Sequence, residues 1–305
     1  MRAGPVGACP RAALVSHTVE GMRGPGVRPE RGRLRSRFAG LSRQRRMLLA
    51  GVSCLVVAAG AVSAVAAVSS DADSAPRATG PGGPAQDQPG PVVLVPGYGG
   101  STSSLDALAA RIRASGRAAT VIQLPGAGTG SLLDDAALLN SAVDAYLRHG
   151  APSVDVIGYS AGGVVALIWA RRDDGASRAR RIVTLGSPFH GTRVAAAAEA
   201  LAPGACPAAC QQLVPGSQLL DGLDVSDPAG LPRWLSLWTS DDQVVTPPDS
   251  AELAGAIDVA VQSVCPAARV GHSELPTSPV VVAMVMQALS QGPLVRPTAA
   301  DCGIS

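Results

Sequence analysis

The sequence predicts an α/β domain in which helices cover both faces of a mostly parallel sheet. Short apolar runs, typical of buried strands, alternate with stretches whose apolar residues recur at helical spacing. Such alternation is typical of βαβ units and a parallel sheet. The motifs that carry chemistry also follow predicted strands, and ligands of such sheets bind at the carboxyl ends of the strands.

The N-terminal segment differs in charge from the rest of the chain. Residues 1–46 hold eleven arginines and two glutamates, a net charge of +9, whereas residues 47–305 carry a net charge of −7. The basic segment has few large apolar groups, so we expect it to be disordered. The acidic remainder gives no electrostatic basis for nucleic-acid binding, and no nucleic-acid partner is expected.

The uncharged run 47–70 predicts a secretory signal or a transmembrane anchor. It follows Arg43, Arg45 and Arg46 and contains the small residues Ala64-Val65-Ala66, which are typical of a signal. It is also long enough to span a bilayer, which takes about 20 residues. Its many Ala, Gly and Ser residues favour a cleaved signal, and membrane attachment stays the alternative. Both imply an extracytoplasmic protein.

Residues 71–90, rich in Pro, Gly, Ala and Asp, predict a flexible linker to a folded domain at 91–305. Apolar runs, two of them closed by Pro-Gly, predict the strands, and apolar stripes at helical spacing predict the helices. The predicted strands are 91–95, 118–124, 153–157, 181–185, 234–238 and 257–264. Helices are predicted at 101–115, at 131–149, from the residues after Ser160 to Arg172, and at 277–290.

A long irregular stretch is expected at 187–231. Its alanine-rich run, Val194 to Ala202, is compatible with a lid helix or an acyl-binding wall. It is equally compatible with a surface insertion.

The motif Gly158-Tyr159-Ser160-Ala161-Gly162 matches G-x-S-x-G, the nucleophile elbow. A strained turn between a strand and a helix has to lift Ser160 above the sheet edge, and glycines at the flanking positions remove Cβ atoms that would collide. The helix that follows directs the positive end of its dipole toward negative charge developing beside Ser160.

A serine nucleophile needs a base and a group that orients the base. The domain holds three histidines: His149 ends a helix, His190 follows a strand, and His272 follows the last strand. If the three residues occur in the order nucleophile, acid, histidine, the acid has to follow a strand that lies between Ser160 and the histidine. Of the three histidines, only His272 leaves such a strand end free for the acid. That acid is expected from residues 240–247.

The domain from about 91 to 290 resembles a compact secreted bacterial lipase or esterase of the α/β-hydrolase superfamily. The matching segments are Val95-Pro96-Gly97-Tyr98-Gly99-Gly100, Gly158-Tyr159-Ser160-Ala161-Gly162-Gly163, Thr184-Leu185-Gly186-Ser187-Pro188-Phe189-His190-Gly191-Thr192, Ser240-Asp241-Asp242-Gln243-Val244-Val245 and Gly271-His272. The resemblance implies an α/β-hydrolase fold. It favours Asp242 over Asp241 as the acid, because one variable residue and then apolar residues follow it. It makes His190 a loop residue beside the site.

The resemblance also implies an oxyanion hole formed by the backbone N–H groups of Ala161 and Tyr98. Many relatives have His-Gly where this chain has Pro96-Gly97. The donor is a backbone group, so this difference bears on the geometry of the loop rather than on the presence of the donor.

The mechanism expected is attack of Ser160 on an ester carbonyl, with His272 as base and Asp242 holding the imidazole. It requires no metal or organic cofactor. The expected protein is a secreted monomeric lipase or esterase acting on ester or lipid substrates. An acyltransferase or thioesterase with the same three residues, and an inactive binding module with the same fold, are the alternatives.

Four cysteines, Cys206, Cys210, Cys265 and Cys302, belong to the predicted exported part. An even count in an exported chain predicts two disulfides, for which three pairings exist. We favour Cys206–Cys210 and Cys265–Cys302. A metal site is disfavoured because no histidine lies at ligand spacing from either pair.

Overall fold

The computed structural model describes residues 83–303. The basic segment 1–46, the apolar run 47–70 and most of the linker lie outside the described residues, so the predictions made for them stay predictions. None of the helices among residues 83–303 is long and apolar enough to cross a membrane.

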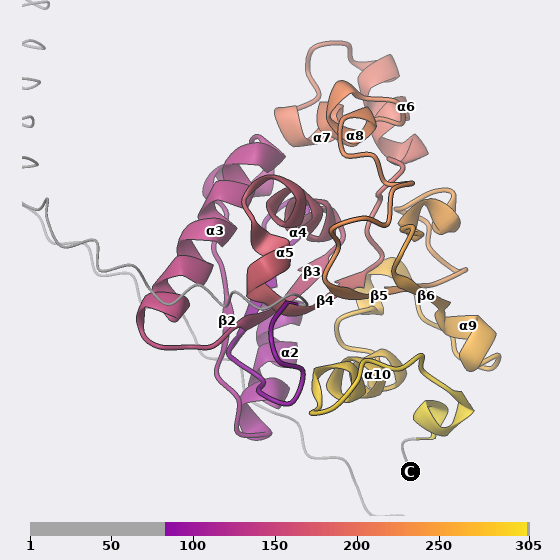
Figure 1. The fold of residues 1–305 in the computed structure, drawn as a ribbon. Helices are drawn as coiled ribbons and strands as arrows, with labels where there is room; N and C mark the ends of the chain where they lie inside the picture. The colour runs from indigo at the N-terminus through magenta and orange to yellow at the C-terminus, as the bar shows by residue number, and fades with distance from the viewer. Residues whose placement is uncertain (1–82, 304–305) are drawn as a thin grey trace, which may run out of the picture. The chain divides into compact units, whose positions relative to one another are not determined.

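Six parallel strands form one sheet in the order β2-β1-β3-β4-β5-β6 (Figure 1). The strands are β1 (Val92–Val95), β2 (Ala119–Val121), β3 (Val154–Tyr159), β4 (Ala179–Leu185), β5 (Arg233–Trp238) and β6 (Ile257–Ala260). The four central strands, β1, β3, β4 and β5, are almost wholly buried, as expected for a sheet covered on both faces.

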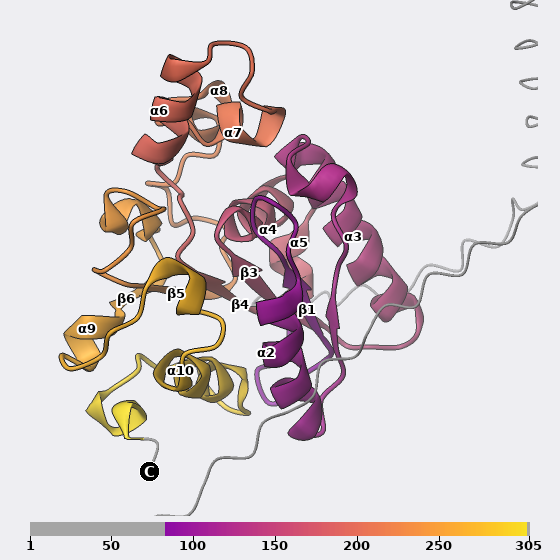
Figure 2. The same cartoon turned by 180° about the vertical axis from the view of Figure 1, so that it is seen from behind.

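Helices cover both faces of the sheet (Figure 2). On one face, α3 (Leu132–Arg148) and α4 (Ala161–Arg172) pack against alternate residues of the strands, such as Val156 and Ile182. On the other face, α2 (Ser103–Ala114) and α10 (Pro279–Leu289) pack against the residues in between, such as Ile157 and Val183. The predicted fold class is confirmed.

Two edge strands are shorter than predicted. The last pair of β2 with β1 is Val121 with Leu94, so no strand forms from 122 to 124. The last pair of β6 with β5 is Ala260 with Trp238. Beyond that point the chain turns into the short helix α9 (Val261–Val264), where a continued strand was expected.

The stretch predicted to be irregular contains three short helices at one end of the domain (Figure 1). They are α6 (Arg193–Leu201), α7 (Ala208–Gln212) and α8 (Gln218–Asp221). The alanine-rich run forms α6, and Thr192 caps this helix by accepting a hydrogen bond from the Val194 N–H. The side chain of Gln212 accepts from the Leu132 N–H at 2.8 Å, which ties α7 to the start of α3.

Two disulfides join the cysteines in the pairing favoured from the sequence. Cys206 and Cys210, with Cα atoms 5.6 Å apart, close the loop that leads from α6 into α7. Cys265 and Cys302, with Cα atoms 5.5 Å apart, attach the C-terminal segment to the end of α9.

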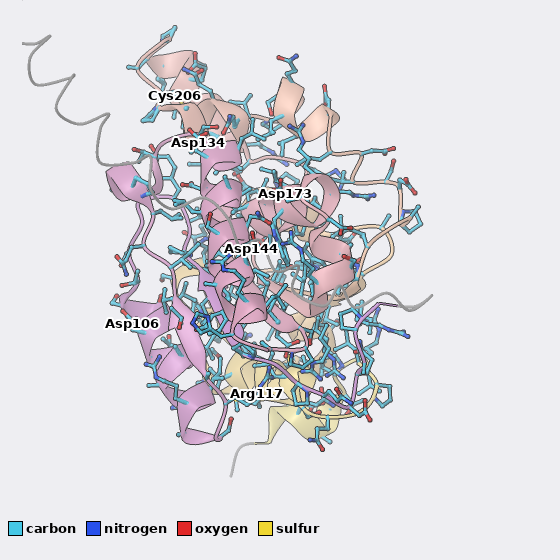
Figure 3. All side chains as sticks on the ribbon, turned by 60° about the vertical axis from the view of Figure 1, so that its left-hand side comes forward. Asp106, Arg117, Asp134, Asp144, Asp173 and Cys206 are labelled. Carbon is cyan, nitrogen blue, oxygen red and sulfur yellow. A yellow bond between two sulfur atoms is a disulfide. The ribbon has the colours of Figure 1, made fainter. Side chains whose placement is uncertain are left out.

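A buried ion cluster lies at the opposite end of the domain, where Figure 3 shows Arg117 far from Cys206. The fully buried Asp155 on β3 forms ion pairs with Arg180 at 2.5 Å and with Arg117 at 2.8 Å. Arg180 also donates to the carbonyls of Leu289 and Ser290 at the end of α10. The cluster thereby fastens the last helix to the sheet.

The end of the predicted linker contacts the domain through Gln86 and Gly90. The backbone carbonyl of Gln86 accepts from Arg180 at 2.9 Å, and its side chain donates to the Arg180 carbonyl at 3.2 Å. Gly90 is buried and its carbonyl accepts from Arg117. Gln86 and Gly90 are therefore held against the domain, whereas Asp87 and Gln88 between them are exposed.

Candidate active site

Ser160 lies in the turn between β3 and α4 with a strained backbone, at φ 54° and ψ −125°. Two close approaches explain the glycines around it. A Cβ at Gly158 would lie 2.5 Å from the Cα of Gly163, and a Cβ at Gly162 would lie 2.3 Å from the Val95 carbonyl oxygen. The turn therefore requires glycine at both places, and the motif has the strand–turn–helix context that defines a nucleophile elbow.

His272 begins a short 3₁₀ turn in the loop that follows β6 and α9, and only 8% of the residue is exposed. Its Nε2 lies 3.0 Å from the Ser160 Oγ. The loop is fixed before and after the histidine. The Gly271 N–H donates to the Glu274 carboxylate at 2.8 Å, and the Leu275 N–H donates to the His272 carbonyl at 3.3 Å.

Asp242 follows β5 and lies against the other ring nitrogen of His272, with its Oδ2 2.7 Å from Nδ1. The second carboxylate oxygen accepts from the N–H groups of Val244 and Val245, each at 2.8 Å. Because a carboxylate only accepts, Nδ1 is the protonated ring nitrogen. Nε2 is therefore free to accept from the Ser160 hydroxyl.

The other acid and the other histidines expected to compete lie apart from this arrangement. Asp241 is exposed and accepts from the Gln262 side chain at 3.3 Å. The ring of His190 hydrogen bonds to the Glu252 carbonyl at 3.2 Å, and that of exposed His149 to the Ala145 carbonyl. The structure brings Asp242, His272 and Ser160 together. Asp241, His190 and His149 form no hydrogen bond with any of these three side chains.

Two backbone groups beside Ser160 are placed to serve as the expected oxyanion donors. Ala161 is the first residue of α4, so its N–H points out of the helix end and has no intrahelical acceptor. Gly97 approaches the serine so closely that a Cβ there would lie 3.4 Å from the Ser160 Oγ, which brings the Tyr98 loop beside the serine. Within residues 83–303, neither the Tyr98 N–H nor the Ala161 N–H donates to another group of the chain.

Tyr159 touches the candidate base, a role that the sequence analysis did not assign. Its ring packs on the His272 imidazole with centroids 5.2 Å apart, and its hydroxyl donates to the His272 carbonyl at 3.3 Å. Burial, with a smaller effect of the Asp242 charge, raises the pKa of Tyr159 to about 12. The hydroxyl therefore stays a donor throughout the neutral and alkaline range.

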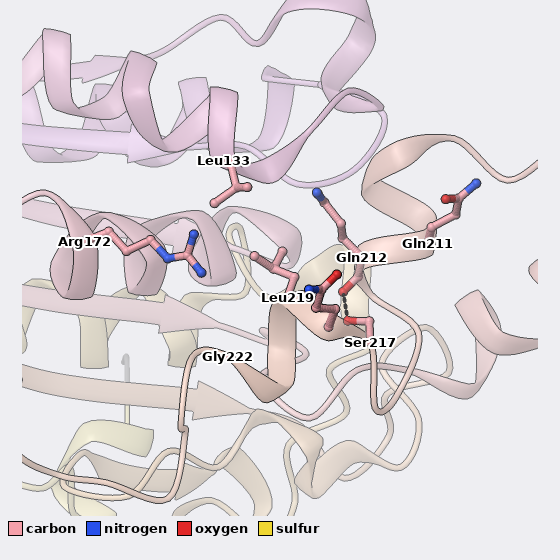
Figure 4. A pocket seen from close by; sticks show the side chains of 8 residues that line it. Leu133, Arg172, Gln211, Gln212, Ser217, Leu219 and Gly222 are labelled. Atoms are coloured by element: carbon pink, nitrogen blue, oxygen red, sulfur yellow. Dashed lines mark hydrogen bonds between the residues drawn. The ribbon is translucent and has the colours of Figure 1, made fainter.

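A pocket of about 630 Å³ lies elsewhere on the domain, between α3, α4, α7 and α8 (Figure 4). Arg172, at the far end of α4 from Ser160, and side chains such as Gln211 and Leu219 line it. It contains none of the three residues brought together above, so the candidate site is defined by side-chain geometry and not by this cavity. Among residues 83–303, no group of three His, Cys, Asp or Glu residues could hold a metal ion.

A family model described as the alpha/beta hydrolase family matches residues 92–301. The chain belongs to the alpha/beta hydrolase family. The matched part of this hydrolase runs from β1 to the C-terminal segment, so it includes every strand of the sheet and the Ser160, Asp242 and His272 positions. No curated protein matches the chain.

Solved structures similar to this alpha/beta hydrolase include two lipases. Lipase B of Aspergillus fumigatus aligns at a TM-score of 0.59 and 19% identity, over 74% of this chain and 59% of its own. Lipase BlEst2 of Bacillus licheniformis in its propeptide form aligns at a TM-score of 0.55 and 20% identity, over 71% and 54%. The alignments thus span little more than half of those two chains. At these identities the likeness concerns the fold.

The mature form of BlEst2 aligns at a TM-score of 0.53 and 18% identity, over 69% of this chain and 96% of its own. Nearly all of that mature lipase thus has a counterpart in the fold of this hydrolase.

Proposed function

We propose that this alpha/beta hydrolase is an exported serine carboxylic ester hydrolase of lipase or esterase type. The observation that carries the proposal is the line of two hydrogen bonds, 3.0 Å from Ser160 Oγ to His272 Nε2 and 2.7 Å from His272 Nδ1 to Asp242 Oδ2. A serine, an imidazole and a carboxylate in this order form the arrangement that activates a hydroxyl for acyl transfer.

In the proposed first step, Ser160 Oγ attacks the ester carbonyl and its proton passes to His272 Nε2. Asp242 holds the ring through Nδ1 and stabilises the imidazolium that forms. The tetrahedral intermediate collapses, the C–O bond to the alcohol breaks, and the alcohol leaves with the proton from Nε2. Water then repeats the sequence on the acyl-enzyme and releases the acid and free Ser160.

The negative oxygen of each tetrahedral intermediate needs donors that are already in place. We assign this role to the N–H groups of Ala161 and Tyr98, which have no acceptor within the described part of the chain. The start of the buried helix α4 adds its dipole at the same point.

Apolar side chains are exposed on the loops that carry Tyr98 and Asp242 and on the segment bonded to the second of these loops, which favours an ester with apolar groups. Tyr98 is 46% exposed, Val244 is 45% exposed and Val194 is 47% exposed. The Thr192 hydroxyl joins the last two segments, since it donates to the Val244 carbonyl at 2.6 Å and accepts from the Val194 N–H. The lipase names of the similar structures agree with this substrate class.

Export is supported by the cysteines. Disulfides persist in oxidising compartments and are rare in the cytosol, and all four cysteines among residues 83–303 are paired. The apolar run before the domain would serve as the export signal or as an anchor.

Hydrolysis of a short nitrophenyl ester by the full chain tests the function. Ser160→Ala and His272→Ala should each lower kcat at least 1000-fold, the order of loss typical of such residues. The matched control is His190→Ala, which changes a histidine whose ring hydrogen bonds to the Glu252 carbonyl and not to Ser160, and it should keep kcat within about 2-fold. Retained turnover in Ser160→Ala, or loss in His190→Ala alone, would contradict the assignment.

A further inference from the structure

Two separate loops carry the groups on either side of the Asp242–His272 hydrogen bond, and one buried hydroxyl joins them. Thr239, the first residue after β5, is fully buried. Its Oγ1 donates to the Val270 carbonyl at 2.6 Å. Val270 lies two residues before His272, and Thr239 lies three residues before Asp242. This hydrogen bond therefore links the start of the loop that carries Asp242 to the start of the loop that carries His272.

The same oxygen also accepts two hydrogen bonds. The Asp241 N–H donates to it at 3.2 Å and the Gln262 Nε2 donates at 2.8 Å. One donated and two accepted bonds fill the capacity of a hydroxyl, so its orientation is fixed. The Thr239 carbonyl in turn accepts from the Asp242 N–H at 3.2 Å, which closes the turn that presents the carboxylate.

Gln262, on α9, holds the acid loop from the opposite side. Its Oε1 accepts from the Ser240 N–H at 3.0 Å, and its Nε2 donates both to Thr239 Oγ1 and to Asp241 Oδ2. This side chain therefore contacts each of the three residues that precede Asp242. Gln262 belongs to the segment that leads from β6 to the histidine loop, so it is a second link between the two loops.

We propose that Thr239 and Gln262 are positioning residues that set the separation of Asp242 and His272. This inference rests on the proposed function, since it concerns the same three side chains. Neither residue contacts Ser160 or the imidazole; each acts through the backbone of the loops. Errors of about 1 Å in the placement of reacting groups cost up to about 100-fold in rate, so loss of this link should lower kcat and leave KM nearly unchanged.

The experiment compares four variants of the full chain. Thr239→Val removes the hydroxyl at nearly constant shape, and Thr239→Ser restores it. Gln262→Leu removes the second link at a half-buried position, so it carries the test if Thr239→Val does not fold. The matched control is Thr184→Val, which removes another fully buried hydroxyl, bonded to Trp234 at 3.1 Å within the sheet and not to either loop.

Three readouts separate positioning from general destabilisation: kcat and KM for a nitrophenyl ester, the rate of Ser160 labelling by a fluorophosphonate, and the proton resonance of the His272 Nδ1–H. Thr239→Val should lower kcat and the labelling rate together by about 10- to 100-fold. It should also shift or broaden the Nδ1–H resonance. Gln262→Leu should act in the same direction, and Thr239→Ser should return kcat to within about 3-fold of the parent. Thr184→Val should lower the melting temperature without changing these readouts.

Parent-like kcat and resonance in Thr239→Val, or in Gln262→Leu if the first does not fold, would overturn the positioning role, as would equal losses in Thr184→Val. Failure of the proposed function has a different signature, because the parent chain itself would then neither hydrolyse the ester nor react with the fluorophosphonate.

Discussion

A single backbone position, Gly186, allows the acid and the imidazole to meet. It is the first residue after β4 and has a φ of +57°. A Cβ there would lie 3.2 Å from His272 Nδ1, 3.3 Å from Asp242 Oδ2 and 2.6 Å from the Leu275 side chain. A methyl group at this position would therefore push the Leu275 side chain aside and lie tightly against the two atoms of the Asp242–His272 hydrogen bond.

Gly186→Ala should lower kcat by about 10- to 100-fold, because the added methyl group displaces the two hydrogen-bonded side chains. The control is Gly150→Ala at the end of α3, which has a φ of +87° and nothing within 4 Å of the added Cβ. That variant should lose about 1 kcal/mol of stability from backbone strain and keep its kcat. Steady-state kinetics with thermal unfolding checks both, and equal kcat values in the two variants would refute the prediction.

Tyr159→Phe should lower kcat by roughly 2- to 10-fold, the value of one modest hydrogen bond. Because the pKa of Tyr159 is raised to about 12, the phenol stays protonated and neutral in the assay range. The ratio of parent to variant kcat should therefore be constant from about pH 6 to about pH 10. A ratio that falls toward one above pH 9 would show that the hydroxyl ionises there and contradict this account.

The sequence predicted the residue types of the site but not these contacts. Ser160, His272 and the stretch 240–247 follow from a local motif, the order along the chain and the strand ends that precede them. The choice of Asp242 over Asp241 came from the resemblance to lipases and esterases. The roles of Gly186, Tyr159 and Thr239 depend on which loops meet in space. A glycine after a strand, a tyrosine inside the motif and a threonine in a loop have many ordinary explanations in a sequence.

At the scale of the elements, α3 carries a buried carboxyl group. Asp135 is 3% exposed and one of its carboxylate oxygens has no hydrogen-bond partner within the described residues. Burial, and then the neighbouring charge of Asp134, raise its pKa to about 6 from an ordinary value of 3.8. The carboxyl group of Asp135 is therefore protonated more readily in the folded state than in the unfolded chain.

The stability that this group contributes is fully present below about pH 4 and is lost as the pH rises through about 6. Asp135→Asn should therefore stabilise the domain by about 1 to 3 kcal/mol at pH 8, with the gain shrinking toward zero near pH 4. The control is Asp106→Asn, an exposed acid in the first turn of α2, which should be neutral or slightly destabilising at both pH values. Urea unfolding at the two pH values measures the difference, and a gain that does not depend on pH would contradict it.

Element boundaries were predictable only where local signals decide them. Gly150 marks the end of α3, which stops at Arg148, one residue before the predicted end. The ends of β2 and β6 depend on where pairing with the neighbouring strand stops, and a local pattern of valines and isoleucines does not contain that information. The short helices α7 and α8 likewise depend on packing, because isolated helices of four or five residues are not stable by themselves.

At the scale of the whole domain, the candidate active site and the buried ion cluster around Asp155 lie at opposite ends of the sheet. The carboxyl ends of β3, β4 and β5 lead to Ser160, Gly186 and Asp242. At the other end, Asp155 connects Arg117 and Arg180, and through them the close of α10 and residues 86–90. Arginine and aspartate are rarely buried without partners. In this cluster the paired side chains attach the end of α10 and residue Gln86 to the sheet.

Asp155→Asn should destabilise the domain by about 3 to 5 kcal/mol, because it leaves the fully buried Arg180 without a counter-charge. It should leave kcat unchanged at temperatures where the variant is folded, since the cluster lies at the end of β3 away from Ser160. Chemical denaturation and ester kinetics at low temperature check the two parts. A loss of kcat in the fully folded variant would contradict the separation of the two ends.

The most direct test of the central claim is to label the full chain with a fluorophosphonate and locate the adduct by peptide mass spectrometry. We expect one covalent adduct, on Ser160, whose formation is lost in His272→Ala and persists in His190→Ala. No adduct in the folded parent chain, or an adduct on another residue, would contradict the account.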